Sequence, residues 1–272
     1  MTAAIFLATL RLNRLNSTAW AASIVIYAGI IVAIFPSIRG IVEVEGYIEA
    51  LPKEFLAVVG LEDTTNLFAD GFTTFQGLLS ADYFSLWLIL LTIYGVMSGG
   101  SLASRDLERG SLDLLLSHPI GRRRLLLAKL GAHAAVLIGL AALSTLTIGL
   151  GGVLVNAKLS FSNVAATHGI AISLVLAILA YSTFFSAWFL SSGKAMVIAG
   201  ILTLLMYALN IVGNVVETMG AIKYISLFHY FDAFSTLNSG SIDAMGLGLY
   251  ISVAILFGIG ALYVFERRDL FN

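Results

Sequence analysis

Long apolar stretches alternate with short polar segments along the chain. Six stretches of roughly 20 residues contain no Asp, Glu, Lys or Arg, and about 20 apolar helical residues cross a hydrocarbon core of about 30 Å. A helix satisfies its own backbone groups in lipid, whereas a β-barrel needs alternating segments of about 10 residues, which are not seen here. The pattern predicts an all-α integral membrane protein with six transmembrane helices in one transmembrane domain, residues 1–272. The predicted spans lie near Thr18–Ser37, Tyr83–Ala103, Leu130–Leu154, His168–Leu190, Ala195–Val216 and Met245–Phe265.

Composition supports the same class. Apolar residues make up 59% of the chain and charged residues 11%, with a mean hydropathy of +0.95. In average soluble domains, apolar residues make up about 45–50% and charged residues about 25%. A soluble fold cannot hide so much apolar surface, and a disordered chain needs low hydrophobicity and high net charge. The chain has no cysteine, which excludes a disulfide scaffold, thiolate metal sites and cysteine nucleophiles.

The N-terminal residues 1–17 predict an interfacial helix. Leu7, Leu10 and Leu15 fall near one helical face, and Arg11 and Arg14 lie mostly elsewhere. Such a helix lies along the membrane surface before the first span. A disordered N-terminus is the alternative.

The distribution of basic residues predicts the orientation. With the N-terminus inside, 11 of the 15 Lys and Arg residues fall in inner segments and only Arg39, Lys53, Lys158 and Lys223 fall outside. The positive-inside rule therefore places both termini in the cytoplasm. The acidic residues lean the other way, since many lie in the first outer loop, residues 38–82.

The sequence of the outer segments predicts elements that lie at the outer membrane surface. Phe55–Leu61 and Phe72–Leu79 predict short helices resting on the outer membrane surface. In the outer segment 217–244, the aromatic stretch Ile225–Phe231 fits an interface belt or a half-inserted helix. Glycines cluster at Gly95–Gly100 and Gly149–Gly152. Close helix packing is favoured for them over a dimer face or a hinge.

The inner segment 104–129 concentrates charge between the second and third spans. Gly110 interrupts the helix leaving the second span, Ser111 is a suitable N-cap, and Pro119 ends the helix that follows. This short amphipathic helix points into the cytoplasm, and its leucines need a cover, either lipid headgroups or a groove on a partner protein. Its apolar face, at i, i+3, i+4 spacing, consists of Leu112, Leu115 and Leu116.

The sequence lacks the residue patterns that several kinds of function require. The spans contain no ionisable residue other than His133 and His168 near their ends, which disfavours an ion-coupled carrier, although backbone carbonyls also bind ions. Four scattered histidines do not have metal-ligand spacing. Ser192–Ala195 contains a Gly-Lys pair without the rest of a phosphate loop, so the chain is not expected to hydrolyse ATP. Arg122–Arg124 lies beside the membrane, where anionic headgroups are the expected partner rather than nucleic acid.

The segment Glu108–Lys129 resembles the corresponding segment of membrane subunits of ATP-binding-cassette exporters of the type-2 permease class. That pattern reads Glu, Gly, Ser or Thr, Leu, a leucine run, Pro, Arg and Lys. Here these places hold Glu108, Gly110, Ser111, Leu112, Leu114–Leu116, Pro119, Arg122 and Lys129. Phe265–Leu270 and Ile225–Tyr230 are also similar to the family, except that Leu227 stands where proline is frequent. The resemblance extends from the first outer loop to the end of the chain.

The resemblance implies a permease that pairs with a second copy or a homologous permease and with cytoplasmic ABC ATPase subunits, two in number. ATP and Mg would bind the ATPases, with no cofactor and no catalytic or metal site on this chain. The helix between spans two and three would be a coupling helix that docks on the ATPase. The implied ATPase-coupling interface comprises Arg105, Glu108, Arg109, Gly110, Ser111, Leu112, Leu115, Leu116, Pro119 and Arg122. The expected membrane-interface anchors are Arg123, Arg124, Lys129, Arg267 and Arg268. The protein is expected to be a multi-pass protein of the plasma membrane of a prokaryotic cell.

Two other functions remain as alternatives. A sensor or scaffold would use its acidic outer loop to bind a ligand, and an ion-coupled carrier would respond to an ion gradient without nucleotide. ATPase stimulation by candidate substrates in the reconstituted complex discriminates among these functions. For an exporter, the scarcity of charge in the spans favours an apolar or amphipathic cargo, or entry from the lipid side.

Overall fold

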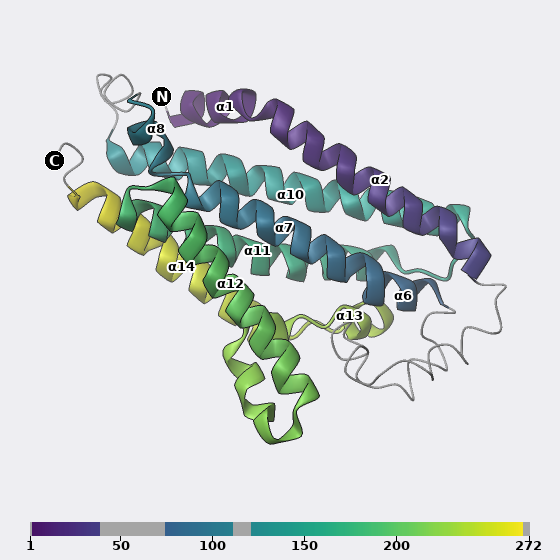
Figure 1. Ribbon diagram of the computed structural model, residues 1–272. Helices are drawn as coiled ribbons and strands as arrows, with labels where there is room; N and C mark the ends of the chain where they lie inside the picture. The colour runs from purple at the N-terminus through teal and green to yellow at the C-terminus, as the bar shows by residue number, and fades with distance from the viewer. Residues whose placement is uncertain (1, 39–73, 111–120, 269–272) are drawn as a thin grey trace.

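The computed structural model describes residues 2–38, 74–110 and 121–268. These ranges are helical and contain no strand (Figure 1). Six helices are long and apolar enough to cross a membrane, and they match the six predicted spans. They are α2 (Arg14–Ile38), α7 (Phe84–Gly100, extended at its start by α6 and η1), α10 (Arg122–Leu154), α11 (Phe161–Phe189), α12 (Ser192–Val215) and α14 (Ala244–Arg267).

The helix α11 forms the centre of the bundle. Its most apolar window is 78% buried, against 17% for α12 and 11% for α14. It packs against α7, α10, α12 and α14, while α2 packs on α10 and on the second span (Figure 1). Because α11 touches other helices on nearly every face, its apolar residues form the core of the protein rather than its lipid-facing surface.

Glycines allow the close approach of α7 to its neighbours. A Cβ at Gly99 would lie 2.6 Å from the Leu179 carbonyl oxygen of α11, and a Cβ at Gly100 would lie 2.7 Å from Met196 of α12. In the second glycine cluster, a Cβ at Gly151 would lie 2.3 Å from Val32 of α2. These glycines pack within the chain, as expected from close helix packing.

The second span begins earlier than predicted. The helix starts with α6 (Phe75–Leu78) and a π-helical turn, η1 (Leu79–Tyr83), and continues into α7. The Thr74 side chain caps it by accepting a hydrogen bond from the Gly77 amide at 3.1 Å. The prediction of a surface helix over Phe72–Leu79 was therefore wrong for the described part, because these apolar residues are buried in the bundle.

The third span also begins earlier than predicted. Helix α10 starts at Arg122 rather than Leu130. The segment 122–129 carries four basic residues, which made it look like a loop. Its charged groups lie at the end of the bundle, where they find partners or solvent, so the helix continues through them.

The N-terminal residues form a helix, α1 (Thr2–Leu12), that packs against the start of α10. The Phe6 ring lies 3.9 Å from the position of a Cβ at Gly131, and Asn13 hydrogen-bonds to His133 at 3.2 Å. Leu12 is 87% exposed on the outward face. The predicted helix over residues 1–17 is thus divided, because α2 already begins at Arg14. Its position at a membrane surface stays a prediction.

The segment after α12 folds back on that helix. It contains two 3-10 helices, η2 (Glu217–Ile225) and η3 (Leu227–Tyr230), and then α13 (Ala233–Ser239). A Cβ at Gly213 would lie 2.8 Å from the Lys223 backbone nitrogen, so η2 lies directly against α12. Leu227 and Phe228 are buried, whereas Tyr224 and Ile225 are exposed. The aromatic stretch therefore packs partly into the protein.

Candidate coupling site

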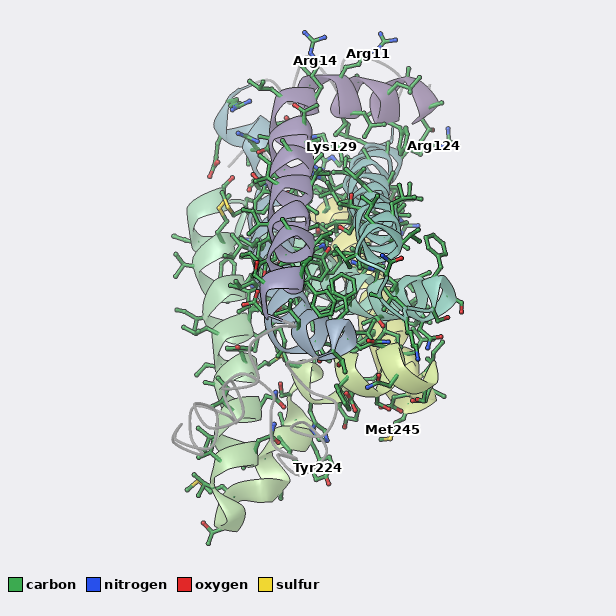
Figure 2. All side chains as sticks on the ribbon, turned by 90° about the vertical axis from the view of Figure 1, so that its right-hand side faces the viewer. Arg11, Arg14, Arg124, Lys129, Tyr224 and Met245 are labelled. Atoms are coloured by element: carbon green, nitrogen blue, oxygen red, sulfur yellow. The ribbon has the colours of Figure 1, made fainter. Side chains whose placement is uncertain are left out.

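Basic side chains gather at one end of the bundle. Figure 2 shows Arg11, Arg14 and Arg124 near this end, with Tyr224 and Met245 toward the opposite end. Helices α1 and α8 and the last turn of α14 also lie here (Figure 1). We name it the inner end; the sequence predicts that it faces the cytoplasm. A separate cluster of buried apolar residues lies at the inner end. It consists of Leu102, Ala103, Leu125, Leu126, Ala187, Ala261 and Phe265.

A short helix, α8 (Arg105–Glu108), follows α7 at the inner end. The chain leaves α7 at Gly100 through a turn and enters α8 without a long linker. Gly110 then has a φ of +65°, a conformation that costs other L-residues about 1–2 kcal/mol. The segment that follows, 111–120, lies outside the described residues.

Glu108 caps the N-terminus of α12. Its carboxylate accepts a hydrogen bond from the Ser192 amide at 2.7 Å and another from the Ser192 hydroxyl at 2.6 Å. The hydroxyl hydrogen bond, followed by the backbone hydrogen bond, lowers the pKa of Glu108 below its usual value. The positive end of the helix dipole also favours a carboxylate at this position. Glu108 therefore joins the start of the predicted coupling loop to the start of the fifth span.

Three serines strengthen this connection. The Ser186 hydroxyl of α11 accepts hydrogen bonds from the backbone amides of Ala103 at 3.1 Å and Ser104 at 3.2 Å. The Ser104 hydroxyl lies 2.8 Å from the Ser192 hydroxyl, and Ser104 and Ser186 are fully buried. The turn between α7 and α8 is thus fixed to the junction of α11 and α12 by buried hydrogen bonds, which are costly to break.

Ion pairs connect α10 to its neighbours. Lys129 forms a partly buried ion pair with Asp106 of α8. Arg123 pairs with Glu266 of α14 at 2.5 Å, with both side chains about half exposed. Arg122 donates a hydrogen bond to the Arg268 carbonyl oxygen at 2.9 Å. The start of α10 is therefore tied to α8 and to the end of α14.

The structure brings together only part of the predicted coupling interface. Arg105, Glu108 and Arg109 lie exposed on and after α8, and Arg122 begins α10. Gly110 lies at the turn between them. The remaining residues, Ser111, Leu112, Leu115, Leu116 and Pro119, lie outside the described residues.

Three of the five predicted membrane anchors have partners within the protein. Arg123 and Lys129 form ion pairs, and the Arg267 guanidinium lies 4.3 Å from the Tyr263 ring centroid. Arg124 is exposed. Contact of these residues with lipid headgroups stays a prediction.

Sequence reasoning missed Ser104, Ser186 and Ser192. Ser192 was considered only as part of an incomplete phosphate loop. Its position immediately before an apolar run was a signal for a helix start, but its partner Glu108 lies 84 residues away. No local pattern connects them.

The histidines in the spans take part in helix contacts. His133 accepts or donates hydrogen bonds with Tyr94 at 3.0 Å and Asn13 at 3.2 Å. His168 is buried between Phe84 and Trp87 and lies 3.3 Å from the Tyr83 hydroxyl. Among the described residues, no three His, Asp or Glu side chains are grouped to hold a metal ion.

Comparison with known proteins gives one family. The sequence profile of a family described as ABC-2 family transporter protein matches residues 19–270. No curated protein matches the chain. The matched residues include all of the contacts described above between α8, α10, α12 and α14.

Proposed function

The chain belongs to the ABC-2 transporter family and is a permease subunit of an ABC transporter, a multi-pass membrane protein; we propose that it works in an ATP-driven exporter. Two copies, or one copy with a homologous permease, surround the pathway. Two cytoplasmic ATPases bind ATP and Mg and supply the energy, because this chain has no phosphate loop.

The observation that carries this proposal is the attachment of both ends of segment 111–120 to the bundle. On one side, Glu108 and Ser104 bind the α11–α12 junction. On the other side, Arg122 and Arg123 bind the end of α14. A force on this segment therefore reaches α12 and α14 through short polar contacts rather than through a flexible linker.

The coupling proceeds in two steps. ATP binding brings the two ATPases together and swings the segments 111–120 inward. Leu112, Leu115 and Leu116 anchor each segment in a groove on the ATPase, where their apolar face is removed from water. Glu108 then moves with the segment and carries the N-terminus of α12, while Arg105 and Arg109 remain exposed to orient the ATPase through charge-assisted contacts.

Co-purification with the ATPase tests the anchors. We expect Leu115→Asp combined with Leu116→Asp to abolish ATPase binding, because two carboxylates would have to be buried without partners. Membrane insertion should be unchanged, since segment 111–120 lies between spans. The measurement is the amount of ATPase retained on a tagged permease.

Ser117→Asp is the matched control, because it adds a charge to the same segment off the leucine face. It should leave ATPase retention close to that of the wild type. Normal retention of the ATPase by the double leucine variant would overturn the assigned anchors.

A further inference from the structure

Exposed arginines and exposed leucines occur together on α1 and at its junction with α2. Leu12 and Leu15 are 87% and 81% exposed, and their neighbours Arg11 and Arg14 are exposed as well. Residues 1–38 contain no Asp or Glu, so no acidic side chain of this segment balances the positive charge. Exposed apolar and cationic side chains on one helix are the combination that binds at an anionic membrane surface.

Another side of α1 is held by the protein. The Phe6 ring packs at Gly131 of α10. Asn13 follows Phe6 by seven residues, on the same helical face, and hydrogen-bonds to His133 of α10. Figure 2 shows α1 crossing the inner end of the bundle while α2 runs along its length, and the two labelled arginines of this segment point away from the bundle. These contacts fix α1 with its arginines directed away from the core.

Arg124 of α10 adds a third exposed cation on the side where α1 packs. It precedes Gly131 by seven residues, which places both on one stripe of α10, and the Phe6 ring of α1 lies against that stripe at Gly131. Leu127, three residues after Arg124, is 48% exposed. The pairing of an exposed arginine with an exposed leucine therefore continues from α1 onto α10.

The ion pairs at the inner end do not involve these three arginines. In the part of the chain that the structure describes, the ion pairs join α10 to Asp106 of α8 and to Glu266 of α14 through other basic residues. The three guanidinium groups can therefore bind an external anion. Guanidinium groups form charge-assisted hydrogen bonds with phosphate, and basic clusters beside a span attract anionic lipids.

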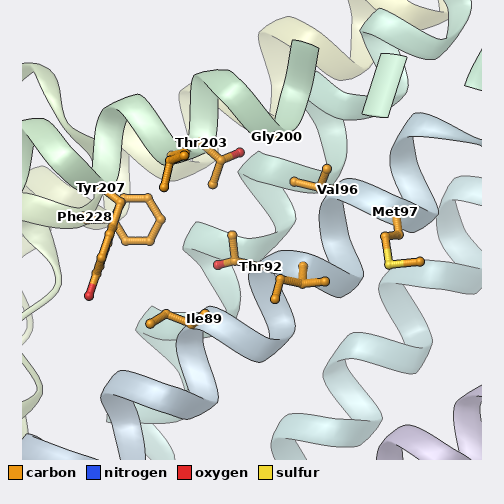
Figure 3. A pocket seen from close by; sticks show the side chains of 10 residues that line it. Ile89, Thr92, Val96, Met97, Gly200, Thr203, Tyr207 and Phe228 are labelled. Carbon is orange, nitrogen blue, oxygen red and sulfur yellow. The ribbon is translucent and has the colours of Figure 1, made fainter. Parts of the chain in front are cut away.

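Charge distinguishes this surface from the groove between α7 and α12 shown in Figure 3. The lining of that groove, which includes Val96 and Gly200, has no Lys, Arg, Asp or Glu among the described residues. Apolar contact alone does not discriminate among occupants there. At the inner end, three positive charges beside exposed leucines favour an amphiphile with a negative headgroup.

We propose that α1 and the start of α10 form a binding surface for anionic phospholipid. The headgroup phosphates lie at Arg11, Arg14 and Arg124, and the acyl chains lie against the exposed leucines beside them. The binding needs no partner protein. Because α10 begins directly after segment 111–120, the bound lipid also holds the helix that leaves the coupling segment. This consequence for coupling rests on the function proposed above.

Spin-labelled lipids test the proposal on the purified permease in phosphatidylcholine vesicles. The measurement compares the motionally restricted fraction of phosphatidylglycerol with that of phosphatidylcholine, both labelled at the same chain position. We expect a larger restricted fraction for phosphatidylglycerol, and the excess should shrink as added salt screens the charges. Equal fractions for the two lipids would overturn the proposal.

Arg11→Gln combined with Arg14→Gln should remove most of the phosphatidylglycerol excess. Each basic residue near an anionic surface changes the affinity roughly five-fold, and Arg124→Gln should lower the excess separately. Arg11→Lys combined with Arg14→Lys keeps the charges and should keep the excess. All these variants should melt like the wild type in phosphatidylcholine, because the substituted side chains are exposed.

Lys158→Gln combined with Lys223→Gln is the matched control, because it removes two positive charges beyond the opposite ends of α10 and α12. It should keep the excess. An excess that persists in the Arg11 and Arg14 glutamine variant, or that the control removes equally, would overturn the assigned surface.

Two further results would assign the arginines to a different partner. Displacement of labelled phosphatidylglycerol by inorganic phosphate would indicate a site for a free anion and overturn the proposal. Loss of ATPase retention in the glutamine variant, with unchanged lipid selectivity, would assign the surface to the ATPase and also overturn it. The lipid measurement uses the permease alone, so its failure is distinguishable from failure of the proposed function.

Discussion

Glu108 illustrates how one side chain changes role when its contacts are known. The family resemblance implies that it faces the ATPase, and its carboxylate instead binds both donors of Ser192 within the chain. The two roles are compatible, because Glu108 is exposed and lies three residues before Ser111. A displacement of Glu108 would therefore strain the start of α12.

The hydrogen bonds of Glu108 predict a pH dependence of stability. Because its pKa is lowered in the folded protein, its stabilising effect is present above the ordinary glutamate pKa, about 4.3. The effect is lost as the pH falls through the lower, folded-state pKa. We expect Glu108→Gln to lower the melting temperature near neutral pH and the difference from wild type to shrink as the pH falls below about 4.3. Thermal melts in detergent across this range provide the measurement.

Ser192→Ala is the companion variant. It removes the hydroxyl bonded to both Glu108 and Ser104 and leaves the amide donor, and it should cost roughly 1–3 kcal/mol, the net contribution of two hydrogen bonds. A melting difference between Glu108→Gln and wild type that stays constant as the pH falls well below the ordinary glutamate pKa, about 4.3, would contradict the assigned cap.

At the scale of elements, Gly99 allows α7 to pack closely against α11. Gly99→Ala would place a methyl group 2.6 Å from the Leu179 carbonyl oxygen, and backbone cannot move aside cheaply. Overpacking of this kind costs about 1–3 kcal/mol, more than the gain of about 1 kcal/mol from the better helix propensity of alanine. We expect a lower free energy of unfolding, measured by titration with a denaturing detergent.

Gly139→Ala on α10 is the matched variant. A Cβ there meets nothing within 4 Å, so the substitution should be neutral or slightly stabilising. Equal effects of the two substitutions would mean that the contact between α7 and α11 does not limit stability.

The sequence predicted the elements better than their ends. Each span was found because about 20 uncharged apolar residues leave few alternatives to a membrane helix. The ends were misplaced where charges begin, as at Arg122–Lys129. A charged turn extends a helix when partners such as Asp106 and Glu266 are near, and those partners come from other elements. The burial of Phe75 was missed for the same reason, since local pattern does not reveal what packs against it.

The candidate site was predictable only as a location. The segment between spans two and three stood out by its charges, Gly110 and its leucines. The hydrogen bonds among Ser104, Ser186 and Ser192 form only when segments about 80 residues apart in the sequence come together.

At the scale of the whole molecule, the proposed function depends on the orientation of the chain in the membrane. The chain has no cysteine, so single cysteines can be introduced without background. We expect a membrane-impermeant maleimide to label Ser241→Cys, after α13, in intact cells and to leave Ser117→Cys unlabelled until the membrane is opened. The reason is the excess of Lys and Arg at the inner end. Labelling of Ser117→Cys in intact cells would reverse the topology.

The central claim is that a partner ATPase moves the inner segment of a passive membrane subunit. The most direct measurement is the distance between spin labels at Ser117→Cys in the two permease subunits of the reconstituted complex, with and without ATP. The account predicts a shorter distance when ATP is bound, while labels at Ser241→Cys on the outer end do not approach in the same way. An inner distance that does not respond to ATP, in a complex that hydrolyses it, would contradict the claim.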